Sequence, residues 1–76
     1  MNIPRGTART QKGTWWPAKQ PGGGYEIQFT CPECGLAAYL DHEIAPTGAV
    51  SPSVGCPNEG KGCSFHQNVV LEGWPP

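Results

Sequence analysis

The sequence predicts a small all-β domain that depends on a cross-link for its stability. The chain has 76 residues, among them eleven Gly, nine Pro and four Cys, and the cysteines fall in two short segments. A chain of this length buries only about 60% of its unfolded surface. A core this small does not offset the entropy of ordering a loop-rich chain, so domains of this kind rely on disulfides or a bound metal ion.

The clearest strand is predicted over residues 25–30, where apolar and polar residues alternate strictly. This alternation places Tyr25, Ile27 and Phe29 on one face. A second apolar run over residues 36–40 can return antiparallel to the first, and residues up to 44 can extend it. The turn between the two runs contains the first cysteine pair, which is therefore expected at the tip of a hairpin.

The remaining strands are predicted in the second half of the chain. Residues 49–54 form a short extended piece, which Pro52 keeps from being a central strand. Residues 64–71 are rich in β-branched and apolar residues and form the last strand. Trp74 is expected to pack on the sheet or on the other two tryptophans. Together these segments predict three to four short antiparallel strands and no helix.

The first third of the chain is predicted to lie outside this domain. Residues 1–24 are interpreted as an extended basic arm that ends in a Gly-rich hinge, and residues 25–76 as the folded domain. Trp15 and Trp16 interrupt the polar arm, and each has up to about 250 Å² to bury. They either fold back over the small core or anchor the chain in a pocket of a partner, where Trp is enriched.

The two cysteine segments predict one structural zinc site. The first is Cys31-Pro32-Glu33-Cys34-Gly35, and the second begins Cys56-Pro57 and ends at Cys63. Structural zinc takes four tetrahedral ligands, usually thiolate or imidazole. Two cysteines separated by two residues can reach one ion across a tight turn, in which proline fixes one backbone angle and glycine permits a positive φ. The second pair is separated by six residues and is less specific. The predicted ligands of a single Zn²⁺ are Cys31, Cys34, Cys56 and Cys63.

Two other uses of the cysteines remain open. Cys63 and His66 have the spacing of a Cys-x2-His pair, so His66 is an alternative ligand if Cys56 points away from the metal. Two disulfides are the other possibility. The first residues lack the apolar run of a signal peptide. We therefore expect a cytoplasmic protein whose thiols stay reduced and free to bind metal.

The motif Cys-Pro-x-Cys-Gly, followed by a strand and a second cysteine pair, resembles the zinc-ribbon superfamily over about residues 25–72. The resemblance implies a zinc-stapled β fold but no single activity, since such ribbons occur in transcription, translation and replication proteins and as protein-binding modules. Residues 50–74 are also similar to small uncharacterised zinc-ribbon proteins of phages and prophages. That similarity would place the chain in a host cytoplasm or in a virus particle.

The charges are unevenly distributed along the chain. Residues 1–20 contain four basic residues and no acidic one, whereas residues 21–76 contain Lys61 against six acidic residues. A basic segment of this kind serves either nucleic acid or an acidic protein surface. The candidate partner-binding residues are Trp15, Trp16, Arg5, Arg9 and Lys12, and Lys19 completes the basic set.

These features predict a zinc-stabilised protein-interaction module rather than an enzyme. Four cysteines would fill the coordination shell of the metal, and neither a recognisable carboxylate–histidine pair nor a phosphate-binding loop is found in the sequence. We expect a protein partner or a larger assembly, such as a small phage-type accessory or structural protein, with no membrane segment and no small-molecule substrate. The alternative is a nucleic-acid-binding zinc ribbon that uses the basic arm. If the function lies on the ribbon itself, the widened loop at residues 58–62 is the place to look.

Overall fold

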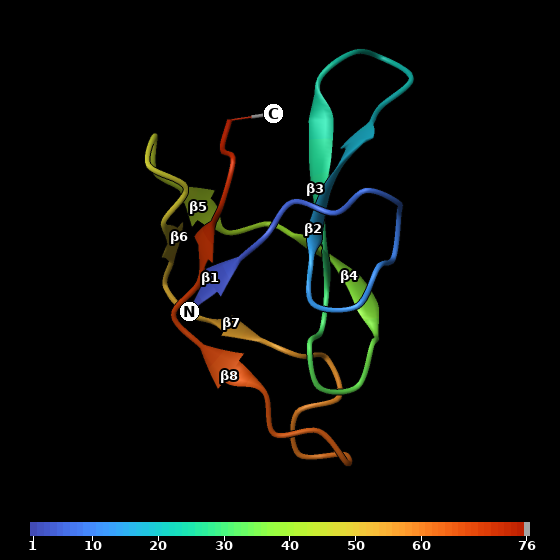
Figure 1. Cartoon of the computed structure of the whole chain (residues 1–76), viewed down its shortest axis with the longest axis vertical. Helices are drawn as coiled ribbons and strands as arrows, with labels where there is room; N and C mark the ends of the chain where they lie inside the picture. Colours follow the sequence, from blue (N-terminus) through green and yellow to red (C-terminus); the bar gives the residue numbers. More distant parts are fainter. Residues whose placement is uncertain (76) are drawn as a thin grey trace.

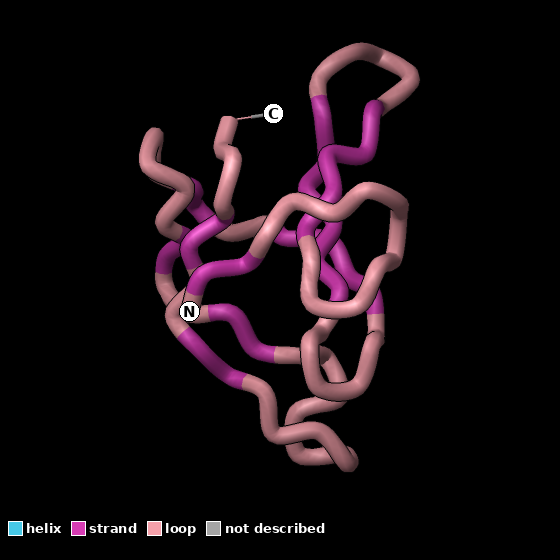
Figure 2. The backbone as a smooth tube through the Cα atoms, in the orientation of Figure 1, coloured by secondary structure: helices cyan, strands magenta, loops and turns pink. Residues whose placement is uncertain are grey.

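A computed structural model describes residues 1–75, which form only strands and loops (Figures 1 and 2). The all-β prediction is confirmed, and no helix that could cross a bilayer is found in this part of the chain. Within these residues there are nine short strands, more than the three or four expected. They are β1 (Asn2–Ile3), β2 (Trp15–Lys19), β3 (Tyr25–Thr30), β4 (Ala37–Leu40), β5 (Glu43–Ile44), β6 (Val50–Ser51), β7 (Val54–Gly55), β8 (His66–Gln67) and β9 (Val70–Leu71).

The largest sheet is three-stranded and antiparallel, in the order β2-β3-β4. Its central strand is the alternating segment predicted from the sequence, and Ile27 and Phe29 are buried in the core. Tyr25 lies at the far end of the same strand and is exposed. Hydrogen bonds continue the sheet beyond β2, because Thr30 donates to the carbonyl of Thr14 and accepts from the N–H of Gly13. As predicted, the turn after β3 carries the first cysteine pair.

Three small strand pairs complete the fold. The pairs β5–β6 and β7–β8 are antiparallel, whereas β1 and β9 run parallel. The last strand predicted over residues 64–71 is divided in two, because β8 pairs with β7 and β9 pairs with β1. Between them, the carbonyl of Asn68 accepts a hydrogen bond from the Met1 ammonium group and that of Val69 accepts one from Val50. At these two residues the chain thus passes from its pairing with β7 to its pairing with β1.

The structure corrects the expectation of an arm at residues 1–24. Ile3 is 2% exposed and Trp15 is completely buried. Strand β2 pairs with β3 along its whole length, and the Gly-rich segment at residues 20–24 is the turn that closes this hairpin (Figure 1). Burial of Ile3 and Trp15 explains the difference. An indole ring in a core stabilises the folded state by several kcal/mol, and an extended arm would lose this stabilisation.

Trp15 lies at the point where the two ends of the chain meet the main sheet. Its ring centroid is 5.6 Å from that of Trp74, which confirms the expected packing of Trp74. The indole Nε1–H donates to the backbone carbonyl of Glu72 at 2.8 Å. The guanidinium of Arg5 lies 5.5 Å above the Trp15 ring centroid, as in a cation–π contact. One side chain therefore connects β2, the segment before it and the C-terminal segment.

The rest of the core joins this region to the cysteine segments. Phe29 on β3 packs against Phe65, which immediately precedes β8, with ring centroids 5.6 Å apart. This contact links the main sheet to the second half of the chain. The buried cluster consists of Ile3, Trp15, Ile27, Phe29, Cys31, Val50, Val54, Cys56, Cys63, Phe65, Val69 and Leu71.

The packing of Trp15 gives a direct test of the fold. We expect Trp15→Ala to lower the free energy of unfolding by about 3–5 kcal/mol, because it leaves a large cavity and removes the hydrogen bond to Glu72. Urea unfolding of the metal-loaded protein, followed by circular dichroism, measures this loss. Trp16→Ala is the matched control, because the Trp16 side chain is only partly buried and should cost less than half as much. Equal losses of unfolding free energy in the two variants would contradict the complete burial of Trp15.

Candidate metal centre

Two loops that are distant in sequence bring the four cysteines together. Cys31 and Cys34 lie in the turn between β3 and β4, and Cys56 and Cys63 lie in the loop between β7 and β8. The four sulfur atoms all lie within 4.8 Å of one another. Two contacts cross between the loops: the Sγ atoms of Cys31 and Cys63 are 3.7 Å apart, and those of Cys34 and Cys56 are 3.4 Å apart. Both loops lie at the lower end of the molecule in Figure 1.

These distances fit a single tetrahedral metal ion. A zinc–sulfur bond of about 2.3 Å implies a separation of about 3.8 Å between sulfurs in a regular tetrahedron. The cysteines are free thiols, and their sulfurs are much farther apart than the roughly 2.05 Å of a disulfide. An all-sulfur donor set favours metals that prefer soft ligands. The four cysteines are therefore positioned to hold one structural metal ion.

The first cysteine loop has the geometry that its sequence predicts. Gly35 has a φ of 78°, and its N–H donates to the carbonyl of Cys31 at 3.0 Å. The backbone N–H groups of Glu33 and Cys34 point at the Cys31 sulfur, with N···S distances of 3.4 and 3.5 Å. Such hydrogen bonds stabilise a thiolate and fix its direction.

The second loop reaches the same result by a longer path. The N–H of Asn58 lies 3.4 Å from the Cys56 sulfur, in the same relation as Glu33 to Cys31 in the first loop. The carbonyl of Asn58 then accepts hydrogen bonds from the N–H groups of Lys61 (2.8 Å) and Cys63 (3.2 Å). These bonds fold the intervening residues into a compact loop, which returns Cys63 to the cluster despite the wide spacing.

The four thiols differ in acidity because their surroundings differ. A hydrogen bond from the backbone of Leu36, together with the Cys56 thiol, lowers the pKa of Cys34 to about 7. Burial raises the pKa of Cys56 to about 12. A backbone hydrogen bond from Phe65 lowers the pKa of Cys63, but burial and the thiols of Cys31 and Cys34 outweigh it and the net shift is upward. In the metal-free protein at neutral pH, Cys56 and Cys63 therefore keep their protons.

A basic side chain lies beside the last residue of the first cysteine loop. Gly35 faces Lys12, whose Cδ is 3.9 Å from the position that a β-carbon on this glycine would take. A divalent ion bound by four thiolates keeps a net negative charge. Lys12, one of the predicted partner-binding residues, thus packs against the first cysteine loop, where its positive charge favours such a site.

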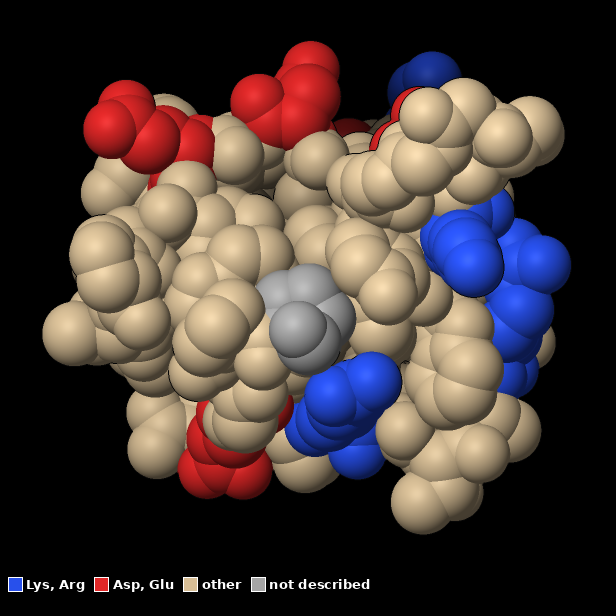
Figure 3. Space-filling model, turned by 90° about the horizontal axis from the view of Figure 1, so that it is seen from above, with Lys and Arg blue, Asp and Glu red and all other residues tan. Residues whose placement is uncertain are grey.

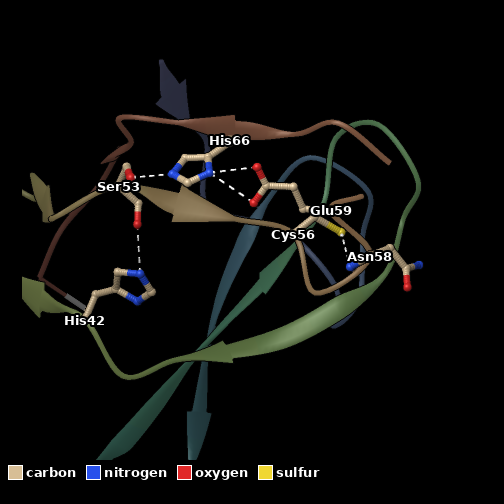
Figure 4. A network of polar contacts seen from close by, with 6 residues as sticks. All are labelled: His42, Ser53, Cys56, Asn58, Glu59 and His66. Atoms are coloured by element: carbon tan, nitrogen blue, oxygen red, sulfur yellow. Dashed lines mark hydrogen bonds and ion pairs between the residues drawn. The ribbon is translucent and has the colours of Figure 1, made fainter. Parts of the chain in front are cut away.

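His66, the alternative ligand, lies in a different group of side chains. Its Nε2 is 2.6 Å from the Ser53 hydroxyl, and its Nδ1 is 2.9 Å from a carboxylate oxygen of Glu59 (Figure 4). Both ring nitrogens are therefore engaged away from the sulfurs. The structure brings together the four-cysteine set and leaves His66 outside it.

The predicted partner-binding residues are divided between the core and the surface. Trp15 is completely buried, so its ring offers no surface to a partner, and this corrects its assignment as an anchor. Trp16 is partly buried and Lys12 is exposed. Arg9 is exposed, and its guanidinium donates to the hydroxyl oxygen of Tyr39 at 3.4 Å. Tyr39 does not belong to the predicted partner-binding set, and the structure leaves it 51% exposed.

Ser53 and Glu59 are partners of His66 that the sequence does not predict. Nothing in the spacing relates Glu59 to His66, so no pairing of a carboxylate with a histidine is expected from it. Glu59 lies in the loop between β7 and β8, and its carboxylate reaches His66 on β8 beside Gly55, which is opposite His66 in the ladder. The one signal in the sequence is the widened second loop, which contains Glu59.

The ligand assignment predicts a distinctive metal titration. Cobalt(II), added to the reduced metal-free chain, should give thiolate-to-metal absorption that saturates at about one equivalent per chain. His66→Ala should leave this spectrum unchanged, whereas Cys56→Ser should weaken it and shift it, because a sulfur ligand is lost. An unchanged spectrum in Cys56→Ser together with an altered one in His66→Ala would reverse the assignment.

Metal affinity is expected to rise with pH across the neutral range. Cys56 and Cys63 are protonated in the metal-free protein, because their pKa values are raised. Each must lose its proton to bind, so each contributes about tenfold in affinity per pH unit. Below pH 7 the thiol of Cys34, with its pKa of about 7, adds to the slope. Competition with a chelator of known affinity between pH 6 and 8 measures this dependence, and a pH-independent affinity would contradict it.

The comparisons with known proteins found no relatives. No protein-family model matches the chain, and searches of curated proteins and of solved structures returned no match. The zinc-ribbon resemblance thus depends on the cysteine motif and on the sulfur geometry of this chain.

Proposed function

We propose that the chain is a protein-interaction module stabilised by one structural zinc ion, with no chemistry at the metal. Zinc would be held by Cys31, Cys34, Cys56 and Cys63, and when bound it supplies a cross-link between the two cysteine loops. The all-sulfur donor set and the sulfur separations support this choice. With four protein ligands, no coordination position is left open for a substrate. The resemblance to small phage-type proteins is consistent with a place in a larger assembly.

A group of aromatic and basic side chains on the main sheet carries the interaction proposal. In the strand register, Trp16 on β2 and Tyr39 on β4 are both opposite Gln28 of β3. Residues opposite one another in a sheet project from the same face. Arg9 contacts the hydroxyl of Tyr39 above this row. Trp, Tyr and Arg are the residue types most enriched in interface hot spots, and here the three lie on one face.

The charge distribution favours a partner with an acidic rim. Viewed from above, the Lys and Arg side chains gather mainly on one side of the molecule and most of the Asp and Glu side chains lie elsewhere (Figure 3). Arg9 and Lys12 belong to the same exposed segment. Complementary charge at the edge of an interface raises the association rate and selects the partner. We therefore propose that the partner presents carboxylates around an apolar or aromatic contact.

Single-stranded nucleic acid is the second candidate, and the same face favours it. An exposed tyrosine beside cations is the arrangement on which unpaired bases stack while phosphates pair with Arg or Lys. Only four basic residues lie in residues 1–20, and the chain as a whole has a net charge of −1. Binding through so few cations would be weak and sensitive to salt, which makes a protein partner the stronger proposal.

Substitutions on this face test the proposal. With the zinc-loaded chain as bait and chemical cross-linking in host lysate, Tyr39→Ala and Arg9→Ala should each reduce capture of the specific partner at least tenfold, since hot-spot truncations cost about 2 kcal/mol or more. Tyr25→Ala is the matched control, because Tyr25 is similarly exposed, at 56% against 51%, but lies at the far end of the sheet. Equal capture by all variants would place the interface elsewhere.

The nucleic-acid alternative has its own measurement. If it holds, a random single-stranded oligonucleotide should bind with an affinity that falls with salt, with a logarithmic slope of at most about 3 for four cations. Tyr39→Ala should weaken this binding and Tyr25→Ala should not. The protein proposal instead expects no oligonucleotide binding at physiological salt.

A further inference from the structure

Three side chains beside the second cysteine loop form a continuous hydrogen-bonded series. The Ser53 hydroxyl lies 2.6 Å from His66 Nε2, and His66 Nδ1 lies 3.0 and 2.9 Å from the two carboxylate oxygens of Glu59. Figure 4 shows the imidazole between the other two groups. These distances lie in the range in which a nucleophile, a general base and an orienting carboxylate act together.

The chemistry of the three groups fixes the direction of each hydrogen bond. An ionised carboxylate can only accept, so His66 Nδ1 must carry the proton that is shared with Glu59. In the neutral imidazole, Nε2 is then the acceptor, and the Ser53 O–H donates to it. The series therefore aims the hydroxyl proton of Ser53 at the basic nitrogen of His66, as the transfer of that proton requires.

The backbone around these residues makes room for the series and holds it in place. Gly55, opposite His66 in the β7–β8 ladder, would with a β-carbon place that atom 2.7 Å from a Glu59 carboxylate oxygen and 3.4 Å from His66 Nδ1. The absence of a side chain at this position thus admits the carboxylate–imidazole pair. On the other side of the site, the imidazole of His42 contacts the Ser53 carbonyl at 2.9 Å through Nε2, which restrains the backbone of the nucleophile.

We propose that Ser53, His66 and Glu59 form an acyl-transfer site, in which Ser53 is the nucleophile, His66 the general base and Glu59 the positioning residue. The site is separate from the sulfur cluster and needs no metal chemistry. It goes beyond the interaction proposed above, and it departs from the sequence-based expectation that the chain has no enzymatic activity.

The reaction follows from the directions of the hydrogen bonds. Ser53 Oγ bonds to the carbonyl carbon of an ester while its proton passes to His66 Nε2. The ester C–O bond then breaks, and the alcohol leaves with that proton. A water molecule next attacks the carbonyl carbon of the acyl-serine and gives a proton to Nε2. The bond between the acyl carbon and Ser53 Oγ then breaks, and the proton on Nε2 passes to Oγ. The products are one carboxylic acid and one alcohol, and Ser53 is restored.

The exposure of the site determines which substrates it can use. The side chains of His66 and Glu59 are 49% and 44% exposed, so a reagent in solution reaches the series directly. An open surface provides few contacts to hold a substrate, and we expect weak binding. The substrate class is therefore small acyl esters with a good leaving group, whose reaction depends on the nucleophile more than on binding energy.

Covalent labelling of the zinc-loaded full chain tests the proposal. A fluorophosphonate should phosphonylate Ser53, with formation of the Oγ–P bond and loss of fluoride and a proton, and peptide mass spectrometry identifies the modified residue. Ser51 and Ser64 are internal controls, because Ser51 precedes the site by two residues and the Ser64 hydroxyl bonds to Glu33 instead of a histidine. Ser53→Ala should abolish the label, and Ser51→Ala should leave its rate unchanged.

Two further variants separate chemistry from structure. His66→Ala should slow labelling by about 100-fold, as the loss of a general base does, and free imidazole added to this variant should restore part of the rate. Glu59→Gln should slow labelling while the cobalt spectrum stays unchanged. It should also shift the His66 tautomer away from the Nδ1–H form, which long-range ¹⁵N–¹H spectra detect.

Three outcomes would overturn the proposal. The first is the absence of label on Ser53 under conditions that label a serine esterase. The second is equal labelling of Ser51, Ser53 and Ser64. The third is an unchanged rate in a folded His66→Ala variant. The cobalt spectrum reports folding in each case, so loss of the fold is not mistaken for loss of the base.

Discussion

The meeting of four sulfur atoms is the constraint on which the rest of this structure depends. The contacts join residues 32 positions apart (Cys31 and Cys63) and 22 positions apart (Cys34 and Cys56). A divalent ion bound by all four sulfurs would turn these contacts into a cross-link, and it would thereby close the β3–β4 and β7–β8 connections at once. Most strands in the fold are only two residues long, and pairs so short are not stable alone. Their persistence depends on this closure and on the aromatic core above it.

The parts of the fold that could be predicted are those that the local sequence determines. Strict alternation determined β3, and the Cys-Pro-x-Cys-Gly spacing determined the turn that follows it. The position of residues 1–24 could not be predicted, because Ile3 stands alone among polar neighbours and its parallel partner Leu71 lies at the other end of the chain. Pairing at that distance is decided by burial in the assembled core, which no local period reveals. The sulfur cluster was predictable because the spacing of the cysteine motif indicates it. The contacts of His66 with Ser53 and Glu59 were not, because they depend on how the loop between β7 and β8 folds.

The two cysteine loops show how one motif can be extended. The first loop has only two residues between its cysteines, and its N–H groups donate to the Cys31 sulfur. The second repeats that geometry at Cys56 and then adds a fold of its own around Asn58. The added residues direct Glu59 away from the metal centre and toward His66. The two ends of the loop, Cys56 and Cys63, thus complete the sulfur cluster, and the residues between them are available for other chemistry.

The parallel pairing of β1 with β9 has a consequence for folding during synthesis. Val70 and Leu71, the partners of Asn2 and Ile3, follow them by 68 residues. Trp15 is likewise completed only by Glu72 and Trp74. During synthesis the chain therefore exposes an indole and a strand edge until these distant partners have been made. The core around Ile3 and Trp15 closes only after the segments that lie between them and their partners.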